Sequence, residues 1–293
     1  LMLTEELIRK VRRIEWVARK RSRDVLSGTY HSAFKGQGIE FAGVREYVPG
    51  DDVRFIDWNV SGRSGRLQIK EFIEERELTV MLLVDLSASQ GFFSGDRSKK
   101  EVAAEIAALL AFTAQMNHDK VGALLFTDRV ESWIPPRKGR THLLRLVREV
   151  LDFQPQSRGT DLGGALSALN RVLKKRSILF LLSDFWDRGY EIPLRMVARR
   201  HEVIALQIQD DREVSWPMEG LVRFRDAETG KTMLVDASSR RFQEHLAVRL
   251  GTHQKAVEEG LARQQVDHVL IPARGDYEKA LFRYFERRKR RHR

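Results

Sequence analysis

The feature that most constrains the fold is an alternation of short apolar runs and amphipathic segments that begins at Leu78. Leu78–Val84 and Ile178–Ser183 are almost continuously apolar, which is typical of strands buried on both faces of a sheet. Segments with the apolar spacing of a helix lie between such runs. Strands that alternate with helices indicate parallel βαβ units. We therefore expect an α/β fold with a doubly wound, mostly parallel sheet.

The same pattern sets the expected bounds of the elements. Strands are predicted at 78–84, 121–126, 178–183, 202–209 and 267–271, with a short edge strand at 130–134. Helices are predicted at 98–118, 140–153, 162–173, 193–200, 239–264 and from 276 to about 290. Ser98 and Glu101 have the spacing of a capping box. Residues 221–235 alternate around Gly230, and we expect them to add a β-hairpin to the core.

The part of the chain before residue 78 has a different character. Thr4–Val25 has helical apolar spacing with Arg and Lys on its other face, whereas Ser27–Arg66 is rich in glycine and turn signals. We expect an amphipathic helix followed by an irregular or small β segment. The predicted division is therefore a basic N-terminal extension at 1–77 and an α/β domain at 78–293.

Charge and composition limit the classes of function that this chain could have. The net charge is +11, basic runs lie at Lys10–Arg23 and Arg287–Arg293, and the sequence has no cysteine. The absence of cysteine agrees with a cytoplasmic protein, and no stretch approaches the ~18 apolar residues of a membrane helix. The basic ends leave non-specific nucleic-acid binding as an alternative, although a terminal basic run is more often a solvated helix face.

Oxygen-bearing side chains follow the two most apolar strands. Asp85, Ser87 and Ser89 come directly after the first, and Asp184 follows the strand at 178–183. Asp and Ser are also ordinary turn residues. If the two strands are neighbours, however, Asp85 and Asp184 face one site. Two carboxylates that close repel each other unless one takes a proton or a cation lies between them, which suggests a metal. Thr160, at the start of a predicted helix, would supply another hydroxyl.

The donor set indicates which metal such a site would hold. All five candidate ligands are hard oxygens, which favours Mg²⁺ or Mn²⁺ over Zn²⁺ or copper. Five ligands leave an octahedral position open, and an acidic side chain of a partner could fill it.

These residues carry a resemblance to a known family. Asp85-x-Ser87-x-Ser89, Thr160 and Asp184 resemble the metal-ion-dependent adhesion site (MIDAS) of von Willebrand factor A domains. One departure is Gln90, where many such sites have Met. The segment from Gly36-Gln-Gly38 to Asp57-Trp58 and Arg63 looks like the signature of the bacterial family DUF58. The resemblance implies a von Willebrand factor A-like fold and an adaptor or chaperone role beside a MoxR-type AAA+ ATPase, or with an acidic client.

The signature segment is a candidate docking surface for a partner. Its charged and aromatic side chains could face a partner or be braced by internal ion pairs, and mixed charges within a few residues favour the brace. The residues in question are Arg45, Asp51, Asp52, Arg54, Asp57, Trp58 and Arg63.

The main enzymatic alternative is a Mg²⁺-dependent phosphohydrolase. Enzymes of the haloacid-dehalogenase type also place an aspartate after their first strand, but they need a second one two residues later, where this chain has Ser87. The sequence also lacks the glycine-rich loop that cradles nucleotide phosphates. We therefore expect a protein that binds but does not catalyse.

Overall fold

The computed structural model describes residues 20, 27–34, 39–74, 77–91, 97–210, 220–225, 227 and 230–291. Its centre is a six-stranded sheet with the order β10-β7-β6-β3-β4-β5. The strands are β3 (Thr79–Asp85), β4 (Lys120–Phe126), β5 (Val130–Arg137), β6 (Ile178–Ser183), β7 (Glu202–Gln209) and β10 (Asp267–Pro272). All neighbouring pairs are parallel except β4 with the edge strand β5. The predicted doubly wound, mostly parallel α/β fold is confirmed.

Helices cover both faces of this sheet. One face carries α4 (Lys99–Met116), α5 (Arg140–Asp152), α2 (Ser27–Phe34) and α10 (Tyr277–Arg291). The other carries α6 (Leu162–Val172), α7 (Glu191–Ala198) and part of α9 (Arg240–Arg263). The helices from α4 onward lie within a few residues of their predicted ranges, because the helical apolar spacing reflects real burial against the sheet. In contrast, α2 and the helix at Trp58–Ser64 lie where the sequence predicts an irregular or small β segment.

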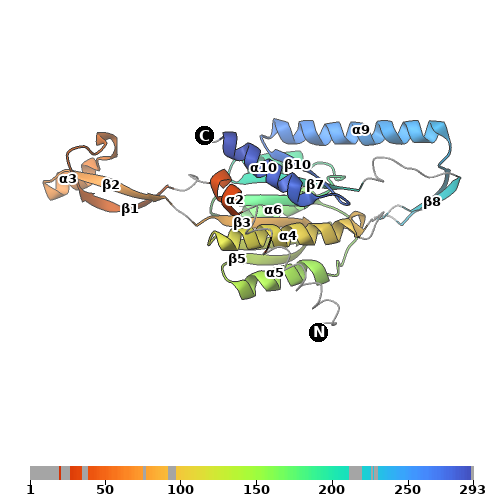
Figure 1. The fold of residues 1–293 in the computed structure, drawn as a ribbon, viewed down its shortest axis with the longest axis horizontal. Coiled ribbons are helices and arrows are strands. Elements are labelled where there is room, and N and C mark those ends of the chain that lie inside the picture. The colour runs from red at the N-terminus through yellow and green to blue at the C-terminus, as the bar shows by residue number, and fades with distance from the viewer. Residues whose placement is uncertain are drawn as a thin grey trace.

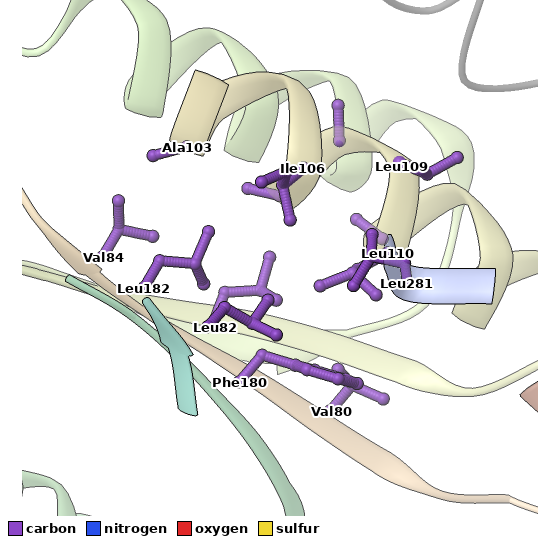
Figure 2. Packing of buried hydrophobic residues seen from close by; sticks show 14 of the residues in the cluster. Val80, Leu82, Val84, Ala103, Ile106, Leu109, Leu110, Phe180, Leu182 and Leu281 are labelled. Atoms are coloured by element: carbon purple, nitrogen blue, oxygen red, sulfur yellow. The ribbon is translucent and has the colours of Figure 1, made fainter. Parts of the chain in front are cut away.

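Side chains of the central strands alternate between two apolar cores. Val80, Leu82 and Val84 belong to the core under α4, whereas Met81 and Leu83 belong to the opposite core. Figure 2 shows the first core, in which these residues and two from β6 face Ile106 and its neighbours on α4. A strand that buries both faces must be apolar at every position, which explains the continuous run in the sequence.

The helix α2 ties part of the N-terminal extension to the main domain. Tyr30 and Phe34 are buried in the core under α4 and α10, and the Tyr30 hydroxyl donates to Asp119 at 3.2 Å. Tertiary packing at this point therefore crosses the boundary predicted at residue 77. The predicted helix Thr4–Val25 lies, apart from Lys20, outside the described residues.

Residues 39–74 form an arm that projects from one end of the molecule (Figure 1). Its antiparallel strands β1 (Ile39–Glu46) and β2 (Gln68–Glu74) are joined through the 3₁₀ turn η2 (Val53–Phe55) and the helix α3 (Trp58–Ser64). Asp57 caps α3 by accepting from the amides of Asn59 and Val60, and Gly65 ends it in the left-handed conformation that favours glycine.

A hairpin projects at the opposite end of the molecule (Figure 1). Its strands, β8 (Leu221–Arg225) and β9 (Thr232–Asp236), pair antiparallel and form their own sheet. The predicted hairpin is present, but it packs next to α9 through Phe224 and Phe242 and does not extend the central sheet. No helix within the described ranges is both long and apolar enough to cross a membrane.

Candidate metal centre

The predicted site residues meet at the carboxyl ends of β3 and β6. These strands are neighbours, with Val84 opposite Leu182, so Asp85 at the end of β3 and Asp184 just after β6 lie at the same edge. From β3 the chain continues to β4 on one side, and from β6 to β7 on the other. Such a place, where successive connections run to opposite sides, is called a topological switch point, and open parallel sheets bind ligands there.

Asp85 is fully buried and firmly oriented. The Ser183 hydroxyl donates to its Oδ2 at 2.6 Å, and the Ser87 amide donates to its Oδ1 at 2.9 Å. Burial, and then the charge of Asp184, raise the pKa of Asp85 to about 7. Two buried carboxylates are therefore close enough to oppose each other's ionisation, the situation that a bound cation relieves.

The two serines of the motif lie side by side after Asp85. Ser87 Oγ and Ser89 Oγ are 3.1 Å apart, and Ser89 lies in the 3₁₀ turn η3 (Ala88–Gly91). The same turn buries Gln90, whose side-chain amide has no hydrogen-bond partner among the described residues. The alternate spacing read from the sequence thus places both hydroxyls beside the buried carboxylate.

The loop that carries Thr160 packs against this turn. The Ala88 amide donates to the Arg158 carbonyl at 3.0 Å, and the Asp161 amide donates to the Thr127 carbonyl at 2.9 Å. Asp161 then caps α6 by accepting from Gly164. These backbone contacts hold Thr160 at the same edge of the sheet as Asp85.

A lysine that sequence reasoning did not single out completes the site. Lys99, the first residue of α4, donates from Nζ to Asp184 Oδ2 at 2.8 Å. The two side chains are 0% and 4% exposed. The residues are 85 positions apart in the chain, and a lysine at a helix start is ordinarily solvated. In the sequence, the only indication of this role was the position of a charged residue next to the apolar face of the predicted helix.

Aromatic side chains form the outer edge of the site. The Trp186 ring stacks on His253 of α9, with ring centroids 3.7 Å apart and an angle of 7° between the planes. The Trp186 amide approaches Asp184 Oδ1 at 3.4 Å. Burial lowers the pKa of His253. The stack therefore fixes the loop after β6 against α9.

The donor set fits a hard divalent cation. Asp85 and Asp184 supply carboxylates, while Ser87, Ser89 and Thr160 supply hydroxyls from adjoining segments, and Mg²⁺ prefers such oxygens. Within the described part of the chain, no group of three or more His, Cys, Asp or Glu side chains could hold a metal ion. A site with two carboxylates and three hydroxyls is not a group of that kind, so the metal ligands stay a prediction.

Most charged residues of the candidate docking segment are paired within the arm. Arg45 donates to both carboxylate oxygens of Asp51 at 2.7 and 2.8 Å, and Arg54 donates to Asp52. Asp57 caps α3. In contrast, Trp58 is 69% exposed. The bracing role expected for these charges is present, and Trp58 is one of several apolar side chains exposed on the arm.

The C-terminal basic run is not a uniformly solvated face. Arg288 is buried and pairs with Asp267 at 2.9 Å and with Glu202. The expectation of a solvated run was wrong at this residue, because α10 packs this turn against β7, β10 and α2. Arg288 is therefore not exposed to a nucleic acid.

Comparison with known proteins finds one family and several similar chains. The family described as "Protein of unknown function DUF58" matches residues 43–256. The uncharacterized protein Rv1480 of Mycobacterium tuberculosis is 34% identical over 232 residues, which cover 77% of this chain and 72% of that protein. Among solved structures, the conserved hypothetical protein BatB of Bacteroides thetaiotaomicron is similar with a TM-score of 0.49 and 16% identity, over 73% of this chain and 99% of the other. The SpRpn10 VWA domain is similar with a TM-score of 0.38 and 10% identity, over 70% and 93%.

The strand order and the single antiparallel edge strand are those of the expected doubly wound, von Willebrand factor A-like sheet. The family match covers most of the arm and the main domain as far as α9. The chain belongs to the DUF58 family.

Proposed function

We propose that this chain is a protein-interaction module whose binding depends on a divalent cation, and that it is not an enzyme. The observation that carries the proposal is the pair of buried carboxylates, Asp85 and Asp184, at the adjoining ends of β3 and β6. The hydroxyls of Ser87 and Ser89 lie 3.1 Å apart beside them. Lys99 balances one of the two carboxylates, and burying the second charge is costly unless a further cation balances it.

Asp85, Ser87, Ser89, Thr160 and Asp184 would hold Mg²⁺ or Mn²⁺. Bound there, the cation would offer an open coordination position to a carboxylate of a partner. The chain's own residues prepare that position: Ser183 and the Ser87 amide orient Asp85. Trp186 and His253 brace the loop after Asp184.

The partner that this chemistry recognises has an exposed Asp or Glu. The net charge of +11 would assist its approach. On the strength of the family resemblance we propose a MoxR-type AAA+ ATPase as that partner, or an acidic client handled with it. We place the interaction in the cytoplasm, where a chain without cysteine fits the reducing conditions.

The first experiment tests the metal centre by thermal unfolding with Mg²⁺ or Mn²⁺ and with EDTA. A ligand that prefers the folded state raises its stability, so the wild type should melt at a higher temperature with metal. Asp85→Ala should lose this shift. Asp236→Ala, which changes an exposed carboxylate on the hairpin, serves as the matched control and should keep it. A metal shift that survives in Asp85→Ala would show that the ligands are wrongly assigned.

The second experiment tests the partner and the absence of catalysis. The purified ATPase should be retained by the immobilised chain with Mg²⁺ and released by EDTA, and Asp184→Ala should weaken the complex. ATP and generic phosphate esters should not be hydrolysed by the chain alone. Metal-dependent hydrolysis that disappears in Asp85→Asn would favour a phosphohydrolase instead.

A further inference from the structure

Lys99 is an unusual residue to find inside an α/β domain. Its side chain is 0% exposed, and its Nζ lies 2.8 Å from Asp184 Oδ2. Lysine is almost never fully buried unless it is paired, and a buried ammonium without a partner carries a large desolvation cost. The ion pair therefore accounts for the presence of this charge, and it lies within the candidate metal centre.

We infer that Lys99 is a built-in counter-cation that competes with the divalent metal for Asp184. This inference rests on the proposed function. In the metal-free chain the ammonium neutralises Asp184, and cation binding requires Lys99 to give up its hold on Oδ2.

The competition follows from charge and from space. Two cations that share one carboxylate oxygen repel each other strongly where little water screens them. Lys99 Nζ occupies the approach to Asp184 Oδ2, and Oδ1 faces the Trp186 amide at 3.4 Å. Asp85 is held by Ser183 and by the Ser87 amide, so Asp184 is the carboxylate whose partner must change.

The location of Lys99 links this exchange to a helix. Lys99 is the first residue of α4, directly after the cap Ser98. A metal that releases Lys99 from Asp184 therefore removes a contact between the start of α4 and the loop after β6. The lysine lowers the apparent metal affinity, since part of the binding free energy is used to break the ion pair.

The test compares Mg²⁺ and Mn²⁺ affinities by calorimetry in the wild type, Lys99→Met and Lys100→Met. Methionine keeps an unbranched side chain of similar length and removes its charge. We expect Lys99→Met to bind the cation about tenfold more tightly than the wild type and to melt at a lower temperature without metal. The control changes Lys100, whose Nζ donates to the Phe153 carbonyl, and should leave the affinity unchanged.

The outcomes separate this inference from the proposed function. If none of the three proteins binds a divalent cation, the metal centre itself is refuted. If all bind with equal affinity, or Lys99→Met binds more weakly, the metal centre stands and the competition is refuted.

A measurement on the wild type covers the case in which Lys99→Met does not fold. Acylation of lysines followed by mass spectrometry should find Lys99 protected without metal and several-fold more reactive at saturating Mg²⁺. Unchanged protection at saturating Mg²⁺ would overturn the inference.

Discussion

Arg288 holds several distant segments of the chain together. Its guanidinium donates to the Ala33 carbonyl in α2 at 3.0 Å and pairs with Asp267 in β10 and Glu202 in β7. It also lies over the Phe34 ring, 4.6 Å from the centroid. Burial lowers the pKa of Arg288 to about 10, so it remains charged at neutral pH and its carboxylate partners remain compensated.

We predict that Arg288→Ala strongly destabilises the fold. Removing one member of a buried ion pair leaves an uncompensated charge and costs about 3 to 5 kcal/mol of unfolding free energy. The control is Arg287→Ala on the exposed side of the same helix turn, for which the expected change is within about 0.5 kcal/mol. Urea unfolding of the two variants measures both values, and equal stabilities would contradict the role of Arg288.

His201 provides a prediction for pH dependence. It is buried, and neither ring nitrogen has a hydrogen-bond partner among the described residues. Burial lowers its pKa from 6.5 to about 4. The unfolded chain therefore takes up a proton as the pH falls through 6.5, whereas the folded chain does so only near 4. The contribution of His201 to stability is complete above pH 6.5 and is lost between these values.

The expected loss is on the order of 2 kcal/mol between pH 6.5 and 4. Asp119, whose pKa is raised to about 6 by burial, acts in the opposite direction, so the difference between wild type and His201→Leu is the useful quantity. His201→Leu should lose less stability than the wild type on acidification, while the exposed His245→Gln should follow the wild type. Parallel curves for all three would contradict the assignment.

At the scale of elements, the junction between β3 and α4 sets the position of the site. Ser98 accepts from the Glu101 amide and Glu101 accepts from the Ser98 amide, which forms the predicted capping box. This cap fixes where α4 begins and therefore where Lys99 reaches Asp184.

We predict that Ser98→Ala lowers the unfolding free energy by about 1 kcal/mol, the usual value of such a cap. It should also weaken the protection of Lys99 from acylation, because the start of the helix frays. Ser167→Ala, at an exposed position within α6, is the control and should change neither quantity. If Ser98→Ala loses stability while the protection of Lys99 from acylation stays unchanged, the cap does not position Lys99.

The sequence predicts elements better than it predicts contacts between them. The spacing of apolar residues predicts the strands and helices from residue 78 onward, and doubly wound topology predicts the neighbouring positions of Asp85 and Asp184. Lys99 with Asp184 and Arg288 with Glu202 depend on tertiary packing between segments 85 or more residues apart. Neither charge differs locally from a solvated one, so no local pattern could reveal these pairs.

At the scale of the whole molecule, two projections lie at opposite ends (Figure 1). The arm precedes the amino end of β3, whereas the hairpin β8–β9 follows the carboxyl end of β7. Because β3, β6 and β7 are parallel, the candidate metal centre lies at the edge of the sheet from which the chain leaves for the hairpin. The arm begins from the other edge.

This geometry predicts which apolar surface assists a partner at the metal centre. Leu221, Met233 and Leu234 of the hairpin are 73%, 62% and 63% exposed, beside basic residues such as Arg223. A partner whose acidic side chain reaches the metal centre would lie close to this surface of the hairpin. Trp58 of the arm would lie at the opposite end of the molecule. Met233→Ser with Leu234→Ser should therefore weaken the metal-dependent complex.

The comparison variant is Trp58→Ser, which removes an aromatic side chain that is 69% exposed and should leave the metal-dependent complex unchanged. Both proteins should keep the wild-type melting temperature, since exposed positions contribute little to stability. Affinity for the immobilised ATPase, measured with Mg²⁺ and with EDTA, separates the two surfaces. If Trp58→Ser abolishes the complex and the hairpin variant does not, the partner binds the arm, and the carboxyl edge of the sheet is not its principal contact.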